Sequence, residues 1–507
     1  MLNPKRLAFT AAVLFAQTAF SVDFNPIDKS ILELQFALNS GQTSSVELVD
    51  FYLDRIERFD QQGPKLNSMA HINPQALDDA AALDQERKTS GPRGPLHGIP
   101  IVVKDNYHTI GLPTEAGSRV LEGFTPHEDA ELVRRLRAAG AIILGKTNMH
   151  EFAAGTESVG SAFGVTRNPY DPNRTPGGSS GGTGGAVAAN FAVAGLGSDT
   201  CGSIRIPASH NALVGLRGTQ GSSSRAGIIP LSTTQDIGGP LARSVTDLAL
   251  LLDLTTGYDP DDPQTAVRIG KFSTKFTTAL NPDALRGARI GVVHDLVRTS
   301  AEDDEVAQVI DSAVAQMQAL GAEVVQVQIP EMERLTVEVA DGFLVILQDF
   351  ANDMNNYLAS QADAPVNTVQ EILDSDLLVE GVQANVQISL NLQSEPPTLY
   401  LSELAKREQL KTTLHALMAA QGLDALAYPT VRSKAALVGE LQTGNNCHLS
   451  AISGFPAITV PAGFTPDGLP VGIELLGRPW QDRTLLGLAY SFEQATHHRR
   501  PPDLLVQ

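Results

Sequence analysis

A pattern of helix, glycine and buried strand occurs twice in this sequence and restricts the fold more than any other feature. The first copy has helical periodicity over 129–138, then a glycine and the apolar run 141–145. The second has apolar residues on one helical face over 306–317, then Gly321 and a valine-rich run that begins at Val324. Short apolar runs rich in β-branched residues are typical of strands buried on both faces. The alternation predicts an α/β fold.

Other segments extend this pattern along most of the chain. Further strands are expected over 98–103, 288–294, 425–428, 457–460 and 471–475, and further helices over 46–56 and 484–494. We therefore expect a single large domain with a mixed, mostly parallel, twisted central sheet flanked by helices. The polar segment 258–285 is interpreted as a surface connection inside this domain. Residues 353–400 are helical with polar interruptions and are expected to form a cap over a site.

The charge balance excludes several classes of partner. The chain has 37 Lys and Arg against 57 Asp and Glu, which gives a formal net charge of −20. An acidic protein repels phosphate backbones and anionic lipid surfaces, so no nucleic-acid partner is expected. No apolar run reaches the length of about 18 residues that a membrane helix needs. The two cysteines, Cys201 and Cys447, are too few for a disulfide-rich scaffold or a four-thiolate zinc site.

The first 21 residues have the pattern of a secretory signal. Lys5 and Arg6 are followed by a mostly apolar stretch over 7–20, and small residues precede a cleavage site after Ser21. An ordinary apolar helix or a retained anchor is the alternative. The pattern predicts a signal peptide over 1–21, a mature domain over 22–507 and a secreted or periplasmic location. A Cys201–Cys447 disulfide would then be chemically accessible, although we expect two free buried thiols.

The stretch over 175–207 is the most unusual part of the chain. Its first half reads TPGGSSGGTGG, a density of glycine that is entropically costly in a folded protein. A flexible linker is disfavoured because the stretch continues into the helix-forming residues 186–189 and the apolar residues 191–196. We therefore expect a backbone that approaches a ligand closely.

Three known glycine motifs fit this sequence poorly. A P-loop pattern over 140–147 encloses a predicted strand, whereas a true P-loop follows its strand. A dinucleotide-binding motif and a nucleophile elbow centred on Ser179 both need a strand directly before the glycines. The segment 168–176 is instead rich in turn residues and proline. The elbow, with Ser179 as the nucleophile of an α/β-hydrolase-like esterase, stays open as an alternative.

A different arrangement of serines resembles the amidase signature family. That family has a lysine at the end of a strand, a Gly-Gly-Ser-Ser-Gly loop and a second serine in the pattern Asp-x-x-Gly-Ser-Ile-Arg. Lys104, Ser179 and Ser203 stand at these positions. Further segments that resemble the family are 95–100, 162–169, 239–245, 454–458 and 469–472. The resemblance covers most of the chain.

The resemblance implies a role for each of these residues. Ser203 is expected to attack the amide carbonyl, Ser179 to relay the proton after a cis peptide bond, and Lys104 to act as the base. Burial is expected to lower the pKa of the lysine, whose ordinary value makes it a poor base at neutral pH. The backbone N–H groups expected to form the oxyanion hole are those of Thr200, Cys201, Gly202 and Ser203. Supporting roles are expected for Ser180, Asp199 and Arg205.

One residue departs from the family pattern. Cys201 stands where the family usually has glycine, inside the expected oxyanion loop. Its N–H group is retained, but its side chain needs room. Cys201 is also an alternative nucleophile, which we disfavour because Ser203 keeps the family's position relative to Ser179 and Lys104.

The resemblance implies hydrolysis of a linear amide to an acid and ammonia or an amine, with no metal or organic cofactor. The family includes general amidases, peptide amidases, fatty amide hydrolases and a subunit that supplies ammonia for glutaminyl-tRNA formation. The predicted signal and the acidic charge argue against the last, and residues 348–358 resemble the peptide amidases. A small-molecule or peptide amide is the expected partner, with a homodimer as the assembly considered. A catalytically inactive binding protein on the same fold remains the other alternative.

Overall fold

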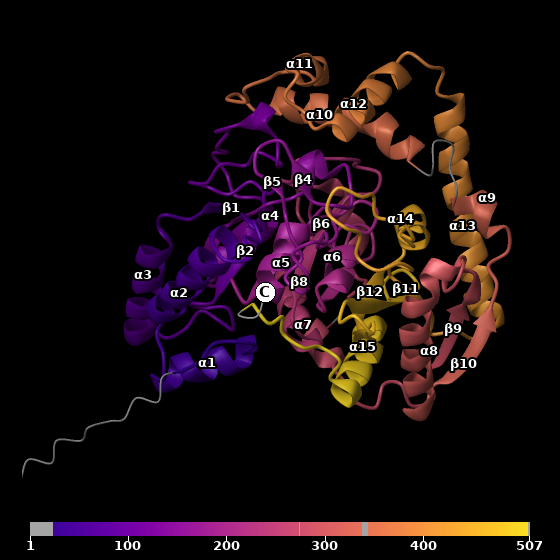
Figure 1. Ribbon diagram of the computed structural model, residues 1–507, viewed down its shortest axis with the longest axis horizontal. Helices are drawn as coiled ribbons and strands as arrows, with labels where there is room; N and C mark the ends of the chain where they lie inside the picture. Colours follow the sequence, from indigo (N-terminus) through magenta and orange to yellow (C-terminus); the bar gives the residue numbers. More distant parts are fainter. Residues whose placement is uncertain (1–23, 273, 337–342, 505–507) are drawn as a thin grey trace, which may run out of the picture.

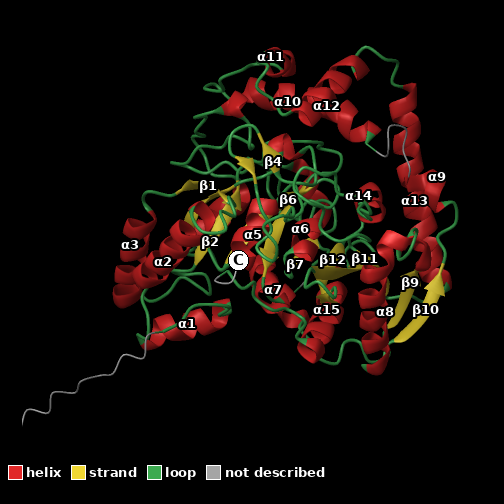
Figure 2. Ribbon diagram, in the orientation of Figure 1, coloured by secondary structure: helices red, strands yellow, loops and turns green. Residues whose placement is uncertain are grey.

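The computed structural model describes residues 24–272, 274–336 and 343–504. Its centre is a mixed sheet of eleven strands, around which the helices pack (Figures 1 and 2). The strands of this sheet are β1 Met69–Ile72, β2 Pro100–Lys104, β3 Ile142–Thr147, β6 Ala194–Asp199, β7 Val214–Arg217, β8 Ile237–Ala242, β9 Arg289–Val293, β10 Glu323–Val327, β11 Ala425–Pro429, β12 Ala457–Phe464 and β13 Pro470–Leu476. Their order is β1-β3-β2-β6-β8-β7-β12-β13-β11-β9-β10. The predicted α/β class, with a mixed central sheet flanked by helices, is confirmed.

The helices fall between these strands along most of the chain. They are α1 Ile31–Ser40, α2 Ser45–Arg55, α3 Ala76–Ser90, α4 Glu131–Ala138, α5 Gly181–Ala188, α6 Arg205–His210, α7 Val245–Thr255, α8 Asp304–Ala319, α9 Met332–Thr336, α10 Leu344–Ser360, α11 Val369–Asp374, α12 Glu380–Leu392, α13 Thr398–Ala420, α14 His448–Ser453 and α15 Asp482–Thr496. A short pair, β4 Val159–Gly160 and β5 Gly164–Val165, forms a separate two-stranded sheet.

Both copies of the helix, glycine and strand pattern form parallel units. Strand β2 pairs in parallel with β3 across α4, and β9 pairs in parallel with β10 across α8. The glycines that end the two helices have positive φ, +88° at Gly140 and +96° at Gly321. At Gly140 a side chain would also meet the backbone of His97 at 2.8 Å. Glycine is therefore required for the tight turn from helix to strand.

The sheet changes from parallel to antiparallel pairing at β6, in a deeply buried region. Strand β6 pairs in parallel with β2 on one side and antiparallel with β8 on the other. Every residue of β2, β6 and β8 is buried, and so is every residue of helix α5 beside them. The carboxyl ends of β2 and β6 and the start of α5 thus lie in the buried interior of the molecule.

Helices α10–α12 lie at one end of the molecule, at the top of Figure 1, and α13 runs from there down one side, where its buried residues share an apolar cluster with β9 and β11. Helices α10–α12 share an apolar cluster with the loops of the central domain, in which Phe350 of α10 packs edge-on against Phe152. The same cluster contains Cys201. We call α10–α13 the cap; the expected helices with interruptions over 353–400 are present, and their covering a site stays a prediction.

The amino-terminal predictions concern residues that the structure does not describe. The predicted signal over 1–21 lies outside the described residues. Among the described residues, no helix is both long and apolar enough to span a membrane.

Candidate active site

Lys104 is the last residue of β2, and its side chain is fully buried. Its Nζ lies 2.7 Å from Ser179 Oγ and 2.9 Å from Ser198 Oγ, and it donates a hydrogen bond to each. Burial lowers the pKa of Lys104 to about 7, although the nearby charges of Asp236 and Asp199 oppose the shift. A substantial fraction of the amine is therefore neutral, and able to accept a proton, at neutral pH.

Ser179 lies two residues before α5, after a cis peptide bond with Gly178. This confirms the cis bond that the family resemblance implied. Glycine is needed at position 178 because a side chain there would meet the backbone of Thr156 at 2.7 Å. The Ser179 hydroxyl is bonded to Lys104, and no histidine of the described chain bonds to it. The loop over 172–180 precedes α5, with no strand directly before the glycines, so the geometry of a nucleophile elbow is missing.

Ser203 lies in the loop between β6 and α6, which we call the oxyanion loop (residues 200–204). Its carbonyl accepts a hydrogen bond of 3.3 Å from the Ser180 N–H, so the two serine loops are joined through their backbones. Ser180 also accepts from Ser198 N and donates from its hydroxyl to Ser198 O. The Ser203 hydroxyl itself makes no hydrogen bond to another described residue, so its link to Ser179 stays a prediction.

Three backbone donors in the oxyanion loop are free. The N–H groups of Thr200, Cys201 and Ser203 donate to no acceptor in the described part of the protein, although all three residues are buried. Buried N–H groups without a partner are rare, and a set of three in one loop is suited to an anionic oxygen. The fourth expected donor differs, because Gly202 N–H lies 2.8 Å from Asp199 Oδ1 and is already bonded.

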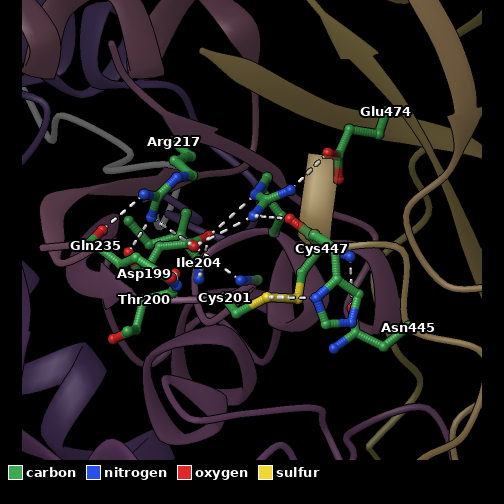
Figure 3. The surroundings of a disulfide bond; sticks show 12 residues. Asp199, Thr200, Cys201, Ile204, Arg217, Gln235, Asn445, Cys447 and Glu474 are labelled. Atoms are coloured by element: carbon green, nitrogen blue, oxygen red, sulfur yellow. Dashed lines mark hydrogen bonds and ion pairs between the residues drawn. A yellow bond between two sulfur atoms is a disulfide. The ribbon is translucent and has the colours of Figure 1, made fainter. Parts of the chain in front are cut away.

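A group of buried charged side chains holds the oxyanion loop in place (Figure 3). Asp199 accepts from Arg205 Nε at 3.1 Å and from Arg217 Nη1 at 3.1 Å, and Arg205 Nη1 lies 2.5 Å from Glu474. All four side chains are fully buried. Burial alone would raise the pKa of Asp199, but the two guanidinium groups hold it well below its ordinary value. Asp199 is therefore a carboxylate that positions Gly202 and Ile204 through their N–H groups.

Several residues of the site were not predicted. Ser198 connects Lys104 to Asn106, whose Nδ2 donates to the same hydroxyl at 3.0 Å. Gln235 Nε2 donates to the Thr200 carbonyl at 3.1 Å, and Asp236 accepts from the Thr200 hydroxyl at 2.5 Å. Ser198 directly precedes Asp199 in the motif, which is the one sequence signal that points to any of them.

The two cysteines form a disulfide, so the expectation of two free thiols is wrong. Cys201 of the oxyanion loop is bonded to Cys447, the residue before α14 (Figure 3). Their Cα atoms are 5.1 Å apart, within the usual range for a disulfide. Their separation of 246 positions in the sequence hides this proximity. His448 lies beside the bridge, with Nδ1 3.8 Å from Cys201 Sγ.

Comparison with known proteins identifies the family. The amidase family model matches residues 47–486, most of the chain. The chain belongs to the amidase signature family. Like its relatives, it is an enzyme that acts on the C–N bonds of amides.

Two kinds of relative have similar identity to the chain. A glutamyl-tRNA(Gln) amidotransferase subunit of Trichlorobacter lovleyi is 36% identical over 484 residues, covering 92% of this chain and 97% of the relative. The crystal structure of native peptide amidase from Stenotrophomonas maltophilia is 36% identical, with a TM-score of 0.87, and covers 95% of this chain and 99% of that one. The crystal structure of the corresponding glutamyl-tRNA(Gln) amidotransferase subunit from Thermotoga maritima is 26% identical, with a TM-score of 0.76, covering 95% and 99%.

These relatives correct the predicted location. Relatives that match over nine tenths of the chain are named as glutamyl-tRNA(Gln) amidotransferase subunits, and tRNA is an intracellular molecule. The expectation of a secreted or periplasmic protein is therefore wrong. A secretory location therefore no longer argues against the branch of the family that supplies ammonia.

Proposed function

We propose that the protein hydrolyses a linear carboxylic amide to the acid and ammonia or an amine, through an acyl-enzyme on Ser203. The observation that carries the proposal is the 2.7 Å hydrogen bond between the buried Lys104 amine and the Ser179 hydroxyl. The oxyanion loop beside it carries Ser203 and three free N–H groups. A base, a relay and oxyanion donors are the parts that acyl transfer by a serine requires.

The reaction would proceed in two halves. Neutral Lys104 takes the proton of Ser179, and Ser179 takes that of Ser203 as the Ser203 oxygen attacks the amide carbon. The oxyanion is held by the N–H groups of Thr200, Cys201 and Ser203. When the C–N bond breaks, Ser179 gives a proton to the leaving nitrogen and recovers one from Lys104. Water then attacks the ester by the same proton path, releasing the acid and restoring the Ser203 hydroxyl.

We propose a peptide or similar carboxamide as the substrate. Among the structures compared above, the peptide amidase has both the higher identity and the higher TM-score. The cap supports a substrate larger than a simple amide, because it adds an apolar cluster beside Cys201. Apolar side chains at that position favour a substrate with an apolar segment next to the amide.

The second candidate is release of ammonia from glutamine by the chain as part of an amidotransferase complex. It is favoured by the 36% identity with the Trichlorobacter lovleyi protein over nearly the whole of both chains. The catalytic residues would be the same, and the two candidates differ in the group beyond the amide and in the need for partner subunits.

The test is release of ammonia and amine by the purified protein from a panel of amides. The panel holds peptide carboxyl-terminal amides, glutamine, and aliphatic and aromatic amides. Wild type is compared with Ser203→Ala and with Ser90→Ala, a matched control at an exposed serine of α3. We expect turnover of peptide amides that is lost only in Ser203→Ala. Turnover that survives in Ser203→Ala would sink the mechanism, and turnover of glutamine alone would favour the second candidate.

A further inference from the structure

The disulfide and the imidazole beside it bring three metal-ligand atoms to one point. The sulfur atoms of Cys201 and Cys447 and a ring nitrogen of His448 all lie within 4.8 Å of one another. The nitrogen nearest to Cys201 is Nδ1, at 3.8 Å from its sulfur. Two sulfurs and one imidazole nitrogen form a ligand set that zinc and cadmium prefer.

The spacing fits a tetrahedral ion once the two sulfurs separate. Zinc binds sulfur at about 2.3 Å and imidazole nitrogen at about 2.0 Å, so neighbouring ligands in a tetrahedron are about 3.5–3.8 Å apart. The distance between Cys201 Sγ and His448 Nδ1 already has this value. Both ends of the site are held, because Cys447 N–H donates to Asn445 Oδ1 and the oxyanion loop is bound to Asp199.

We propose that the oxyanion loop carries a redox-gated site for a thiophilic divalent metal ion. With the disulfide intact, the two sulfurs are bonded to each other and the site is closed. After reduction, Cys201, Cys447 and His448 bind Zn²⁺ or Cd²⁺, with one position left for water. The bound metal ion then stops catalysis. This part of the proposal rests on the proposed function.

The chemistry of the switch needs a named reductant. A dithiol or a phosphine supplies two electrons, the S–S bond breaks, and each sulfur takes one proton to become a thiol. With a phosphine, water supplies the oxygen of the phosphine oxide. Metal binding then displaces both thiol protons to solvent, while neutral His448 gives the lone pair of Nδ1. Cys201 is 8% exposed and His448 is partly buried, so the site lies near the protein surface.

The proposed metal site shares the oxyanion loop with the catalytic groups. Cys201 supplies one of the three free N–H groups and stands two residues before Ser203. A side chain at Gly202 would meet the Cβ of Cys447 at 3.1 Å, so the loop packs directly on the second cysteine. Widening the sulfur separation to that of two zinc ligands moves this backbone, and small displacements of oxyanion donors cost large factors in rate.

Reduction without metal has a smaller effect. Asp199 still binds Gly202 and Ile204, and Gln235 still binds the Thr200 carbonyl. We therefore expect the reduced, metal-free enzyme to stay within about threefold of the oxidised rate. The metal-loaded enzyme is expected to lose at least tenfold.

The experiment uses the full chain in both redox states. Protein reduced with tris(2-carboxyethyl)phosphine is desalted without oxygen and titrated with Co²⁺, whose sulfur-to-metal absorption reports thiolate ligation, and then with Zn²⁺. Oxidised protein is titrated in parallel. We expect one equivalent of Co²⁺ in the reduced protein alone, displaced by Zn²⁺ and removed by a chelator. Amide hydrolysis is followed in the same samples, each compared with its own metal-free rate.

Variants assign the ligands. Reduced Cys447→Ser is expected to lose the absorption, and His448→Ala to weaken Co²⁺ binding at least tenfold. His127→Ala, at an exposed histidine, is the matched control and should bind as wild type does. Equal uptake by oxidised and reduced protein, or thiolate absorption that survives in Cys447→Ser, would overturn the site. Uptake without loss of turnover would overturn its coupling to catalysis. Because the absorption does not depend on turnover, uptake by a protein that hydrolyses no amide in the panel would point to failure of the proposed function instead.

Discussion

The catalytic region and the cap are built by different physical means. In the catalytic region the polar side chains are buried, and charged ones such as Lys104 and Arg205 are fully buried and each held by at least two partners. In the cap, most side chains of α13 have some exposure, and only five of its 23 residues are buried. Buried polar groups without partners are costly, so the first region tolerates little change, whereas the second can vary at small cost. We infer that chemistry is fixed in the first and substrate choice adjusted in the second.

The largest effect is expected at Lys104, the proposed base. Lys104→Met keeps the length and packing of the side chain but removes the amine that Ser179 and Ser198 bind. Loss of an acid–base group typically lowers the rate by about 10²–10⁴-fold. Steady-state kinetics on the best substrate would measure the loss. Lys434→Met, at a partly exposed lysine, serves as the control, and a Lys104→Met rate within threefold of wild type would exclude a lysine base.

The next effect concerns stability. Asp199→Asn leaves the buried Arg217 without its carboxylate and leaves Arg205 paired with Glu474 alone, and breaking a buried pair typically costs about 3–5 kcal/mol. The matched change in the cap is Asp353→Asn, where the carboxylate accepts from Thr233 in a half-buried position. There we expect a loss of about 1 kcal/mol or less. Urea unfolding would measure both, and equal losses would contradict the contrast between the two regions.

Strands with a local sequence signal were predicted, and strands shaped by tertiary packing were not. Strand β2 with its terminal Lys104 and the β9–α8–β10 unit were predicted, because apolar runs and helical periodicity are local signals. Strands β6 and β8 were not, since their glycines and proline disfavour strands. In β6 the reason is tertiary: a side chain at Gly197 would meet Ser180 Oγ at 2.8 Å. Close packing of the site on the sheet outweighs the local preference.

The site was predicted only as far as its motifs reach. Lys104, Ser179 and Ser203 were placed by resemblance, and the structure joins the first two by a hydrogen bond. Glu474 was missed as the partner of Arg205, and the Cys201–Cys447 disulfide was considered but not expected, because both partners lie more than 240 residues away along the chain. Nothing in a single sequence shows that such distant segments meet.

A third prediction uses the pH dependence of the catalytic region. Because burial lowers the pKa of Lys104 to about 7, its amine is protonated below that pH and neutral above it. We expect kcat/KM to rise about tenfold per pH unit up to about pH 7 and to level off above it. Lys104→Met should remove this dependence from its residual rate. A wild-type profile that is flat from mildly acidic pH upward would count against the assignment.

The smallest effect is expected from removing a polar contact between the cap and the rest of the protein. Tyr357 of α10 has its hydroxyl 2.7 Å from His108 Nε2, and the two rings also lie in contact at 5.6 Å. Tyr357→Phe removes one hydrogen bond worth about 1 kcal/mol and keeps the ring contact. Since burial lowers the pKa of His108 to about 4, the imidazole stays neutral throughout the pH range that titrates Lys104.

If the cap selects the substrate, this change should act on binding alone. We expect KM to rise up to about fivefold, the factor that 1 kcal/mol represents, for long peptide amides, with kcat within twofold of wild type. Short amides that do not reach the cap should be unaffected in both constants. A fall in kcat for short and long substrates alike would show that this contact positions the catalytic region, and the division between the two regions would then have to be redrawn.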